Sequence, residues 1–318
     1  MERDLLTLFD VTRSGLEDLF ELADDLRLHP GRKPLSGKTV AMIFQKPSLR
    51  TRVSFEVGIT QLGGTSVFLT QEDIGIGSRE PVRDIAKLLS RYTDAVVARL
   101  FGHDGIVELA RHASIPVINA LTDLSHPCQV LADCYTLRRM GRLRENMKVT
   151  FVGDGNNIVN SWLELAATFP LRFVLAAPQG YGPDPSTLER AKTAGVSAID
   201  ITDDPVAAAT GADVLYTDVW VSMGQENEAD ERRKAFKGFR IDDRLLGRAK
   251  PDCLVMHCLP AHRGEEITTE ILEGERSIVF DQAENRLHVQ KAILTRLMAP
   301  PEPEPQGGNG SQHRQVSS

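Results

Sequence analysis

Short apolar runs alternate with longer segments of helical periodicity along almost the whole chain. The spacing leaves room for a helix between consecutive strands, which is typical of parallel strands joined by crossover helices. The sequence therefore predicts an α/β fold made of doubly wound parallel sheets. The predicted strands are residues 40–44, 65–69, 95–99, 116–119, 149–152, 173–176, 214–217, 254–256 and 278–280.

A polar segment at residues 141–146, which begins with a glycine, divides this alternation into two sets. A chain of 318 residues is long enough for two domains. We therefore expect one domain at residues 1–140 and a second at 147–284, with a cleft between their sheets. Residues 299–318 are mostly Pro, Glu, Gly, Gln and Ser, which predicts a disordered tail.

The charge balance argues against a nucleic-acid-binding protein, because 37 basic and 44 acidic residues give a net charge of −7. The four cysteines form no Cys-x-x-Cys pair. The sequence shows no signal peptide and no apolar run of about 18 residues. We therefore expect a cytoplasmic protein with free thiols and no membrane partner.

The segment after the first predicted strand has the features of an anion-binding helix start. Pro47 interrupts the strand, and Ser48 occupies the N-cap position before a first helical turn at residues 49–52. Free N–H groups and the positive end of the helix dipole favour an anion there. Arg50 and Arg52 point to different sides of a helix, so we expect Arg50 to face the anion and Arg52 to form a supporting salt bridge. A capped surface helix fits the same pattern.

Other polar residues follow predicted strands, where open α/β sheets bind their ligands. Arg99 ends the third strand. His126 precedes Pro127 at a helix start, and Gln129 lies three residues further on, so both side chains can face one ligand. Taken singly, Arg99 also fits a surface cation, and His126 fits a structural histidine.

A glycine-rich turn, Gly153-Asp154-Gly155-Asn156-Asn157, follows the fifth strand and opens a helix. A nicotinamide cofactor is one interpretation. However, the third glycine of a dinucleotide motif would fall at Ile158, and the next strand lacks an acidic end. Asn157 and Asn160, three residues apart, suit a small carboxylate better. A tight turn without a ligand is the remaining alternative.

Two further strand ends carry reactive groups. Asp218 and Ser222 could hold an ammonium group, although a capped helix start fits them equally well. His257, Cys258 and His262 raise the question of a metal. We expect none, because no fourth ligand has zinc-finger spacing and adjacent residues on a strand end point to opposite sides. A cysteine nucleophile is a second alternative.

Together these motifs resemble those of the aspartate/ornithine carbamoyltransferase family, over about residues 5–297. Ser-Leu-Arg-Thr-Arg at residues 48–52 is similar to the family's Ser-Thr-Arg-Thr-Arg motif, with Leu49 in place of a threonine. Residues 126–133 resemble its His-Pro-x-Gln-x-x-x-Asp motif, and Arg99 stands at the position of its carbonyl-contacting arginine. The Asp-x-x-x-Ser-Met-Gly segment from residue 218 and His-Cys-Leu-Pro from residue 257 resemble the ornithine branch.

The resemblance implies that the δ-amine of L-ornithine attacks carbamoyl phosphate, giving citrulline and phosphate without a cofactor. It implies three catalytic residues, Arg99, His126 and Cys258, with Cys258 orienting the amine and forming no covalent intermediate. The implied ornithine ligands are Asn157, Asp218, Ser222 and Met223. The implied carbamoyl phosphate ligands are Ser48, Leu49, Arg50, Thr51, Arg99, His126, Gln129, Cys258, Leu259 and Arg286.

The resemblance also implies domain roles and an assembly. Residues 1–140 would bind carbamoyl phosphate, residues 147–284 would bind ornithine, and a helix at 285–298 would pack back onto the first domain of a homotrimer. Gly75 stands where the family has a glutamine that contacts a neighbouring subunit's substrate, so that side-chain contact is lacking here. The open alternatives are a carbamoyltransferase acting on acetylornithine or putrescine, a nicotinamide oxidoreductase, and a non-catalytic relative that binds a small anion.

Overall fold

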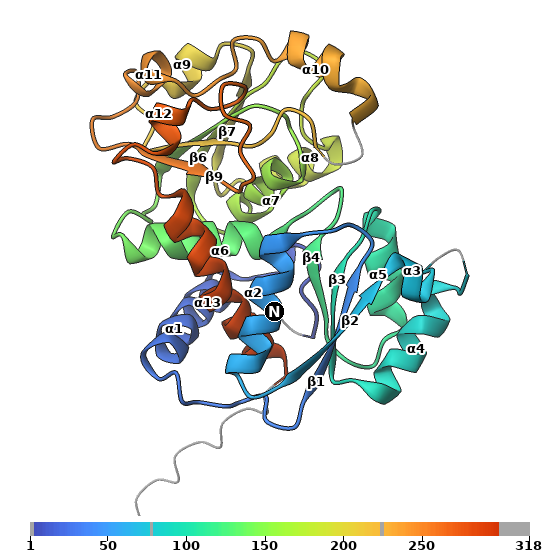
Figure 1. The fold of residues 1–318 in the computed structure, drawn as a ribbon. Helices are drawn as coiled ribbons and strands as arrows, with labels where there is room; N and C mark the ends of the chain where they lie inside the picture. Colours follow the sequence, from blue (N-terminus) through green and yellow to red (C-terminus); the bar gives the residue numbers. More distant parts are fainter. Residues whose placement is uncertain (1–2, 77–78, 223–225, 299–318) are drawn as a thin grey trace, which may run out of the picture.

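The computed structural model describes residues 3–76, 79–222 and 226–298 as two lobes, each with a parallel sheet and helices around it (Figure 1). The predicted tail at residues 299–318 lies outside the described residues. In the first lobe the strand order is β2-β1-β3-β4, and in the second it is β7-β6-β5-β8-β9. The two doubly wound parallel sheets predicted from the sequence are confirmed.

The strands of the first sheet are β1 (Thr39–Phe44), β2 (Thr65–Thr70), β3 (Ala95–Arg99) and β4 (Val117–Leu121). Those of the second sheet are β5 (Met147–Val152), β6 (Leu171–Ala176), β7 (Ala198–Thr202), β8 (Val214–Thr217) and β9 (Leu254–His257). Every residue of β3, β5 and β8 is buried. Helices cover both faces of such sheets, which is why these strands read as continuous apolar runs.

The helices of the first lobe are η1 (Leu8–Asp10), α1 (Arg13–Leu28), α2 (Leu49–Gln61), α3 (Gln71–Ile74), α4 (Val82–Tyr92), α5 (His103–His112) and α6 (Pro127–Arg139). Those of the second lobe are α7 (Asn157–Ala166), α8 (Pro185–Ala194), α9 (Pro205–Ala209), η2 (Glu226–Glu228), α10 (Ala229–Ala235), α11 (Asp243–Leu246) and α12 (Thr269–Leu272). No helix in the described ranges has the length and apolar character needed to cross a bilayer.

The last helix, α13 (Val279–Met298), leaves the second lobe and runs along α1, α2 and α6 of the first (Figure 1). Val289, Ala292 and Ile293 are fully buried on it. The amide Nδ2 of Asn285 donates a hydrogen bond to Thr136 Oγ1 of α6 at 3.0 Å. The helix therefore belongs to the core of the first lobe although it follows the last strand of the second.

The strand predicted at residues 278–280 is wrong, because Val279 and Phe280 begin α13. Ser277 forms an isolated parallel bridge with Val255, and the N–H of Ile278 donates to the Val255 carbonyl at 3.0 Å. The extended chain beside β9 thus ends one residue before the helix. The edge strand β7 was missed, because its exposed polar positions interrupt the apolar pattern.

We predict that α13 stabilises the first lobe mainly through its buried apolar face. Ile293→Ala removes a fully buried side chain and should lower the free energy of unfolding by about 2–5 kcal/mol. Phe280→Ala, on the same helix but 68% exposed, should change it by less than about 0.5 kcal/mol. Guanidinium unfolding of both variants measures this. An equal loss of unfolding free energy in the two variants would contradict a stabilising role for the buried face of α13.

Candidate active site

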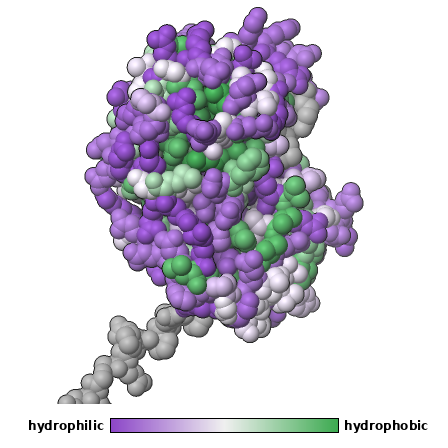
Figure 2. All heavy atoms as spheres, turned by 60° about the vertical axis from the view of Figure 1, so that its left-hand side comes forward, coloured by the Kyte–Doolittle hydropathy of each residue, from purple (hydrophilic) through white to green (hydrophobic). Residues whose placement is uncertain are grey.

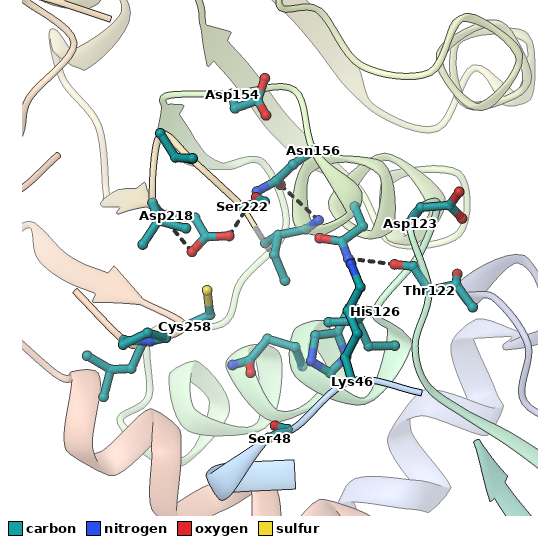
Figure 3. Close-up of a pocket in the computed structure, with 18 of the residues that line it drawn as sticks. Lys46, Ser48, Thr122, Asp123, His126, Asp154, Asn156, Asp218, Ser222 and Cys258 are labelled. Carbon is teal, nitrogen blue, oxygen red and sulfur yellow. Dashed lines mark hydrogen bonds between the residues drawn. The ribbon is translucent and has the colours of Figure 1, made fainter. Parts of the chain in front are cut away.

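A cleft of about 1500 Å³ lies between the lobes, at the carboxyl ends of β1, β3, β4, β5, β8 and β9 (Figure 3). This is where open parallel sheets place their ligand sites. The residues singled out by sequence that line it are Ser48, Leu49, Arg50, Thr51, Arg99, His126, Gln129, Asn157, Asp218, Ser222, Cys258, Leu259 and Arg286. Met223 lies outside the described residues.

The predicted helix start after β1 is confirmed. Ser48 is the N-cap of α2, and its Oγ accepts a hydrogen bond from the Thr51 N–H at 3.4 Å. Arg50 lines the cleft. Arg52 points elsewhere: its Nε lies 3.0 Å from Glu56 Oε1, and its guanidinium lies 3.6 Å from the centre of the Phe68 ring. The supporting salt bridge expected of Arg52 is therefore present.

Arg99 and Arg286 add two buried guanidinium groups to the same side of the cleft as Arg50. Each is only 4% exposed, and no protein group accepts from the Nε of either among the described residues. Burial, followed by the charges of Arg286 and Arg50, lowers the pKa of Arg99 to about 10. Three cations that repel one another next to an open cleft form a strong anion site.

The register of β3 against β4 shifts between Ala98 and Arg99, where Ala98 pairs with Asn119 and Arg99 with Leu121. Such irregularities re-aim side chains beside ligand sites. The extra residue, Ala120, lies on β4, whereas β3 keeps its regular register against β1 up to the pair Arg99 and Phe44.

A chain of hydrogen bonds fixes Arg286. Its Nη2 donates to Thr51 Oγ1 at 2.7 Å, and its Nη1 donates to Gln129 Oε1 at 3.0 Å. Gln129 Nε2 in turn donates to Asp133 Oδ1 at 2.9 Å, and Gln282 Nε2 donates to the same oxygen at 2.7 Å. Burial raises the pKa of Asp133 to about 7. The network ties α2, α6 and α13 together below the cleft.

His126 is the N-cap of α6 and is 4% exposed. Burial, and then the charges of Arg286 and Arg99, hold its pKa well below the usual value of 6.5. The ring is therefore neutral at pH 7 and carries a single N–H donor. Its Nδ1 is buried without a protein partner in the described part of the chain.

The second lobe presents a carboxylate and a thiol to the same cleft. Asp218 accepts hydrogen bonds from the Val219 N–H and from Asn156 Nδ2, both at 2.8 Å (Figure 3). Burial and the neighbouring Asp218 carboxylate raise the pKa of Cys258 well above its usual value. A protonated thiol is a poor nucleophile, which argues against the cysteine-nucleophile alternative.

Asp218, His257 and Cys258 each bring one candidate ligand atom within 4.8 Å of the others. The expectation that His257 and Cys258 point to opposite sides is therefore wrong, because the chain leaves β9 between them. However, His257 Nδ1 accepts from the Leu259 N–H at 2.8 Å, and its Nε2 pairs with Glu266 Oε1 at 3.0 Å. Both ring nitrogens are thus occupied, and the remaining pair is too few for a structural zinc site.

The sequence analysis missed several lining residues, including Lys46, Asp123 and Arg232. Asp123 follows the end of β4, so its position after a strand was a usable signal. Asn160 also lines the cleft, and its Nδ2 donates to the Leu124 carbonyl at 3.0 Å. Asn157 also donates to a carbonyl, that of Thr122, at 2.6 Å, while still lining the cleft.

Fold and cleft together define a two-lobed α/β protein with an anion site on one side of the cleft and a carboxylate and a thiol on the other. Two family models match the chain: the carbamoyl-P binding domain of aspartate/ornithine carbamoyltransferase at residues 3–139, and its Asp/Orn binding domain at residues 145–297. The chain belongs to the aspartate/ornithine carbamoyltransferase family.

Individual relatives agree with the family models. An ornithine carbamoyltransferase of Chlorobaculum tepidum is 59% identical over 84% of this chain and 79% of its own length. The solved ornithine carbamoyltransferase of Pyrococcus furiosus is 46% identical, with a TM-score of 0.89 over 93% of this chain and 97% of that one. A solved N-acetyl-L-ornithine transcarbamylase is 28% identical, with a TM-score of 0.84 over 93% of this chain and 100% of that one.

We predict that the buried Asp133 carboxyl makes stability depend on pH. Its folded-state pKa of about 7 lies above the unfolded value of 3.8, so its contribution is complete below pH 3.8 and is lost as pH rises through 7. Asp133→Asn keeps an acceptor for both glutamine amides and cannot ionise. Between pH 5 and 8.5 the variant should gain about 1–3 kcal/mol in unfolding free energy relative to wild type. Guanidinium titrations at both pH values measure this. The prediction is contradicted if the difference in unfolding free energy between the variant and the wild type is the same at both.

Proposed function

We propose that the protein is an ornithine carbamoyltransferase, which transfers the carbamoyl group of carbamoyl phosphate to the δ-amine of L-ornithine. The products are L-citrulline and phosphate. The observation that carries the proposal is that Arg50, Arg99 and Arg286 face Asp218 and Cys258 across one cleft. The first set suits a phosphorylated carbonyl compound, and the second suits an amino acid with a further amine.

The start of α2 is proposed to hold the phosphate. Ser48, the backbone N–H groups of the first turn and the Arg50 guanidinium provide the donors, and the helix dipole adds positive potential. Leu49 is 74% exposed and contributes its backbone N–H only. A threonine at this position would supply a hydroxyl donor, which Leu49 lacks.

The carbamoyl oxygen is proposed to lie against Thr51, Arg99, His126 and Arg286. Attack by the amine builds negative charge on this oxygen, and donors fixed before the reaction stabilise that charge. Neutral His126 donates one ring N–H to it, and the unpaired Nε groups of the two arginines lie nearby. Gln129 holds Arg286 through the 3.0 Å hydrogen bond and completes this side of the pocket.

Ornithine is proposed to bind from the second lobe, with Asp218 and Ser222 on its α-amino group and Asn157 and the Met223 backbone near its carboxylate. Cys258 and the Leu259 carbonyl orient the δ-amine. Leu259 has a φ of 58°, a left-handed conformation that costs a non-glycine residue about 1–3 kcal/mol. The hydrogen bond from its N–H to His257 Nδ1 holds the backbone in this conformation.

A cytoplasmic homotrimer acting in arginine biosynthesis completes the proposal. In support of assembly, α2 exposes Leu49, Val53 and Val57, and the edge strand β2 exposes Val67. Hydrophobic atoms also reach the surface in patches on the face shown in Figure 2. In support of a reducing compartment, all four cysteines are free.

An assay for the ureido group of the product, with carbamoyl phosphate and a panel of amines, tests this function, because each carbamoylated amine carries that group and only ornithine gives citrulline. L-Ornithine should be the preferred acceptor, and N-acetylornithine and putrescine, which lack the free α-amino or carboxylate group, should react at least about 100-fold less efficiently. Preference for either of these amines would reassign the substrate. The absence of carbamoyl transfer to any of them would overturn the proposal.

Arg50→Ala should lower kcat/KM for carbamoyl phosphate by about 10²–10³-fold, because it removes a charged donor from the phosphate. The far-ultraviolet circular dichroism spectrum should stay unchanged. Arg52→Ala is the matched control, since its side chain pairs with Glu56 away from the cleft. Near-normal kinetics in Arg50→Ala would show that Arg50, at the start of α2, does not bind the phosphate during the reaction.

The rate should rise with pH, because only the neutral δ-amine attacks and amines of this kind have a pKa near about 10.4. We expect kcat/KM for ornithine to rise by up to about tenfold per unit between pH 7 and 9. His126, whose pKa is lowered, stays neutral throughout this range. Steady-state rates across the range measure the slope, and a flat profile would count against control by amine deprotonation.

A further inference from the structure

One face of α7 consists of polar residues that are directed at the first lobe. Asn157, Asn160, Ser161 and Glu164 follow the i, i+3, i+4, i+7 spacing of a single helical face. Such a face between packed elements is normally apolar. Here Ser161 is fully buried and Glu164 is 1% exposed. Buried polar groups of this kind need partners, and all four find them in the segments that lead to His126 or in the N-terminal segment.

The two asparagines hold the loop between β4 and α6 by its backbone. Asn157 Nδ2 donates to the Thr122 carbonyl at 2.6 Å, and Asn160 Nδ2 donates to the Leu124 carbonyl at 3.0 Å. This loop ends at His126. Side chains of the second lobe thus hold this loop together with hydrogen bonds inside the first lobe, such as that from the Ser125 N–H to Thr122 Oγ1.

Ser161 and Glu164 extend these contacts to the backbone of His126. The His126 N–H donates to Ser161 Oγ at 2.8 Å, and Ser161 Oγ lies 3.0 Å from Ser125 Oγ. Ser125 Oγ donates to Glu164 Oε2 at 2.9 Å, and the Leu8 N–H donates to the same oxygen at 2.8 Å. Burial raises the pKa of Glu164 to about 8. Where Glu164 Oε2 accepts from Ser125, Ser161 is left to donate to Ser125, and the donors then point from His126 towards Glu164.

His126 has no other side-chain anchor among the described residues. Its Nδ1 has no protein partner, and the next residue is Pro127, which has no N–H to fix the start of α6. The placement of the ring thus depends on the backbone at residue 126. A displacement of about 1 Å at a catalytic donor is enough to lower a rate by about 100-fold.

We propose that Ser161, supported by Ser125 and Glu164, is a positioning residue that sets His126 against the carbamoyl oxygen. This inference rests on the proposed function. It gives α7, a helix of the lobe proposed to bind ornithine, a role in placing His126. His126 in turn is proposed to contact carbamoyl phosphate. The ordinary alternative is a hydrogen-bonded contact that only joins the lobes.

A double-mutant cycle between Ser161→Ala and His126→Ala separates these two roles. Ser161→Ala leaves the His126 N–H without its acceptor and should lower kcat by about 10- to 100-fold. The KM for carbamoyl phosphate should change by less than about 3-fold, because the phosphate donors are untouched. In the His126→Ala background the same substitution should cost less than about 2-fold.

Ser90→Ala is the matched control. Ser90 Oγ likewise accepts from a backbone N–H, that of Ser114, at 3.0 Å, but it lies on α4 outside the cleft. Its kcat should equal that of wild type. Thermal unfolding of each variant shows whether the fold is kept. If Ser161→Ala does not fold, Ser125→Ala, which breaks the chain one bond further on, takes its place with an expected loss of about 3- to 10-fold.

An equal loss of kcat in both backgrounds, or an unchanged kcat in Ser161→Ala, would overturn the positioning role. Failure of the proposed function has a different signature, because the wild-type protein would then form no citrulline. A loss confined to the background that retains His126 supports the proposal.

Discussion

The guanidinium groups of Arg50, Arg99 and Arg286 lie together at the edge of the cleft, and no carboxylate in the described part of the chain forms an ion pair with them. Arg99 and Arg286 are almost fully buried, and burial lowers the pKa of both. The charges of Arg286 and Arg50 lower the pKa of Arg99 further, and the charge of Arg50 lowers that of Arg286. Hydrogen bonds to Thr51 and Gln129 fix Arg286 but leave its charge unmatched. A dianionic substrate supplies the missing negative charge, so its binding offsets the repulsion between the buried guanidinium groups.

The two lobes are joined so that the two substrates face each other. α13 carries the chain back into the core of the first lobe, and α7 spans the gap through its polar face. Asn156, which caps α7, also donates to Asp218 on the amino acid side. Helix α7 and its N-cap therefore contact both halves of the cleft.

Much of this arrangement could be predicted from sequence, since strand ends in parallel sheets converge on one edge. Ser48, Arg99 and Asp218 were found because each lies at or shortly after the carboxyl end of a strand. The hydrogen bonds that Asn157 and Asn160 donate to carbonyls of the other lobe could not be predicted, because a helical face does not reveal which partner it meets. The false strand at 278–280 has the β-branched composition of a real one, and only the contact of Ser277 with Val255 shows where the helix begins.

The most direct test is a crystal structure with carbamoyl phosphate and L-norvaline, an amino acid that resembles ornithine but lacks the δ-amine. The account predicts phosphate oxygens at Ser48 and Arg50, and the carbamoyl oxygen within about 3 Å of donors on Arg99 and His126. It predicts the norvaline side chain directed at Cys258. Carbamoyl phosphate bound away from the three arginines would contradict the account.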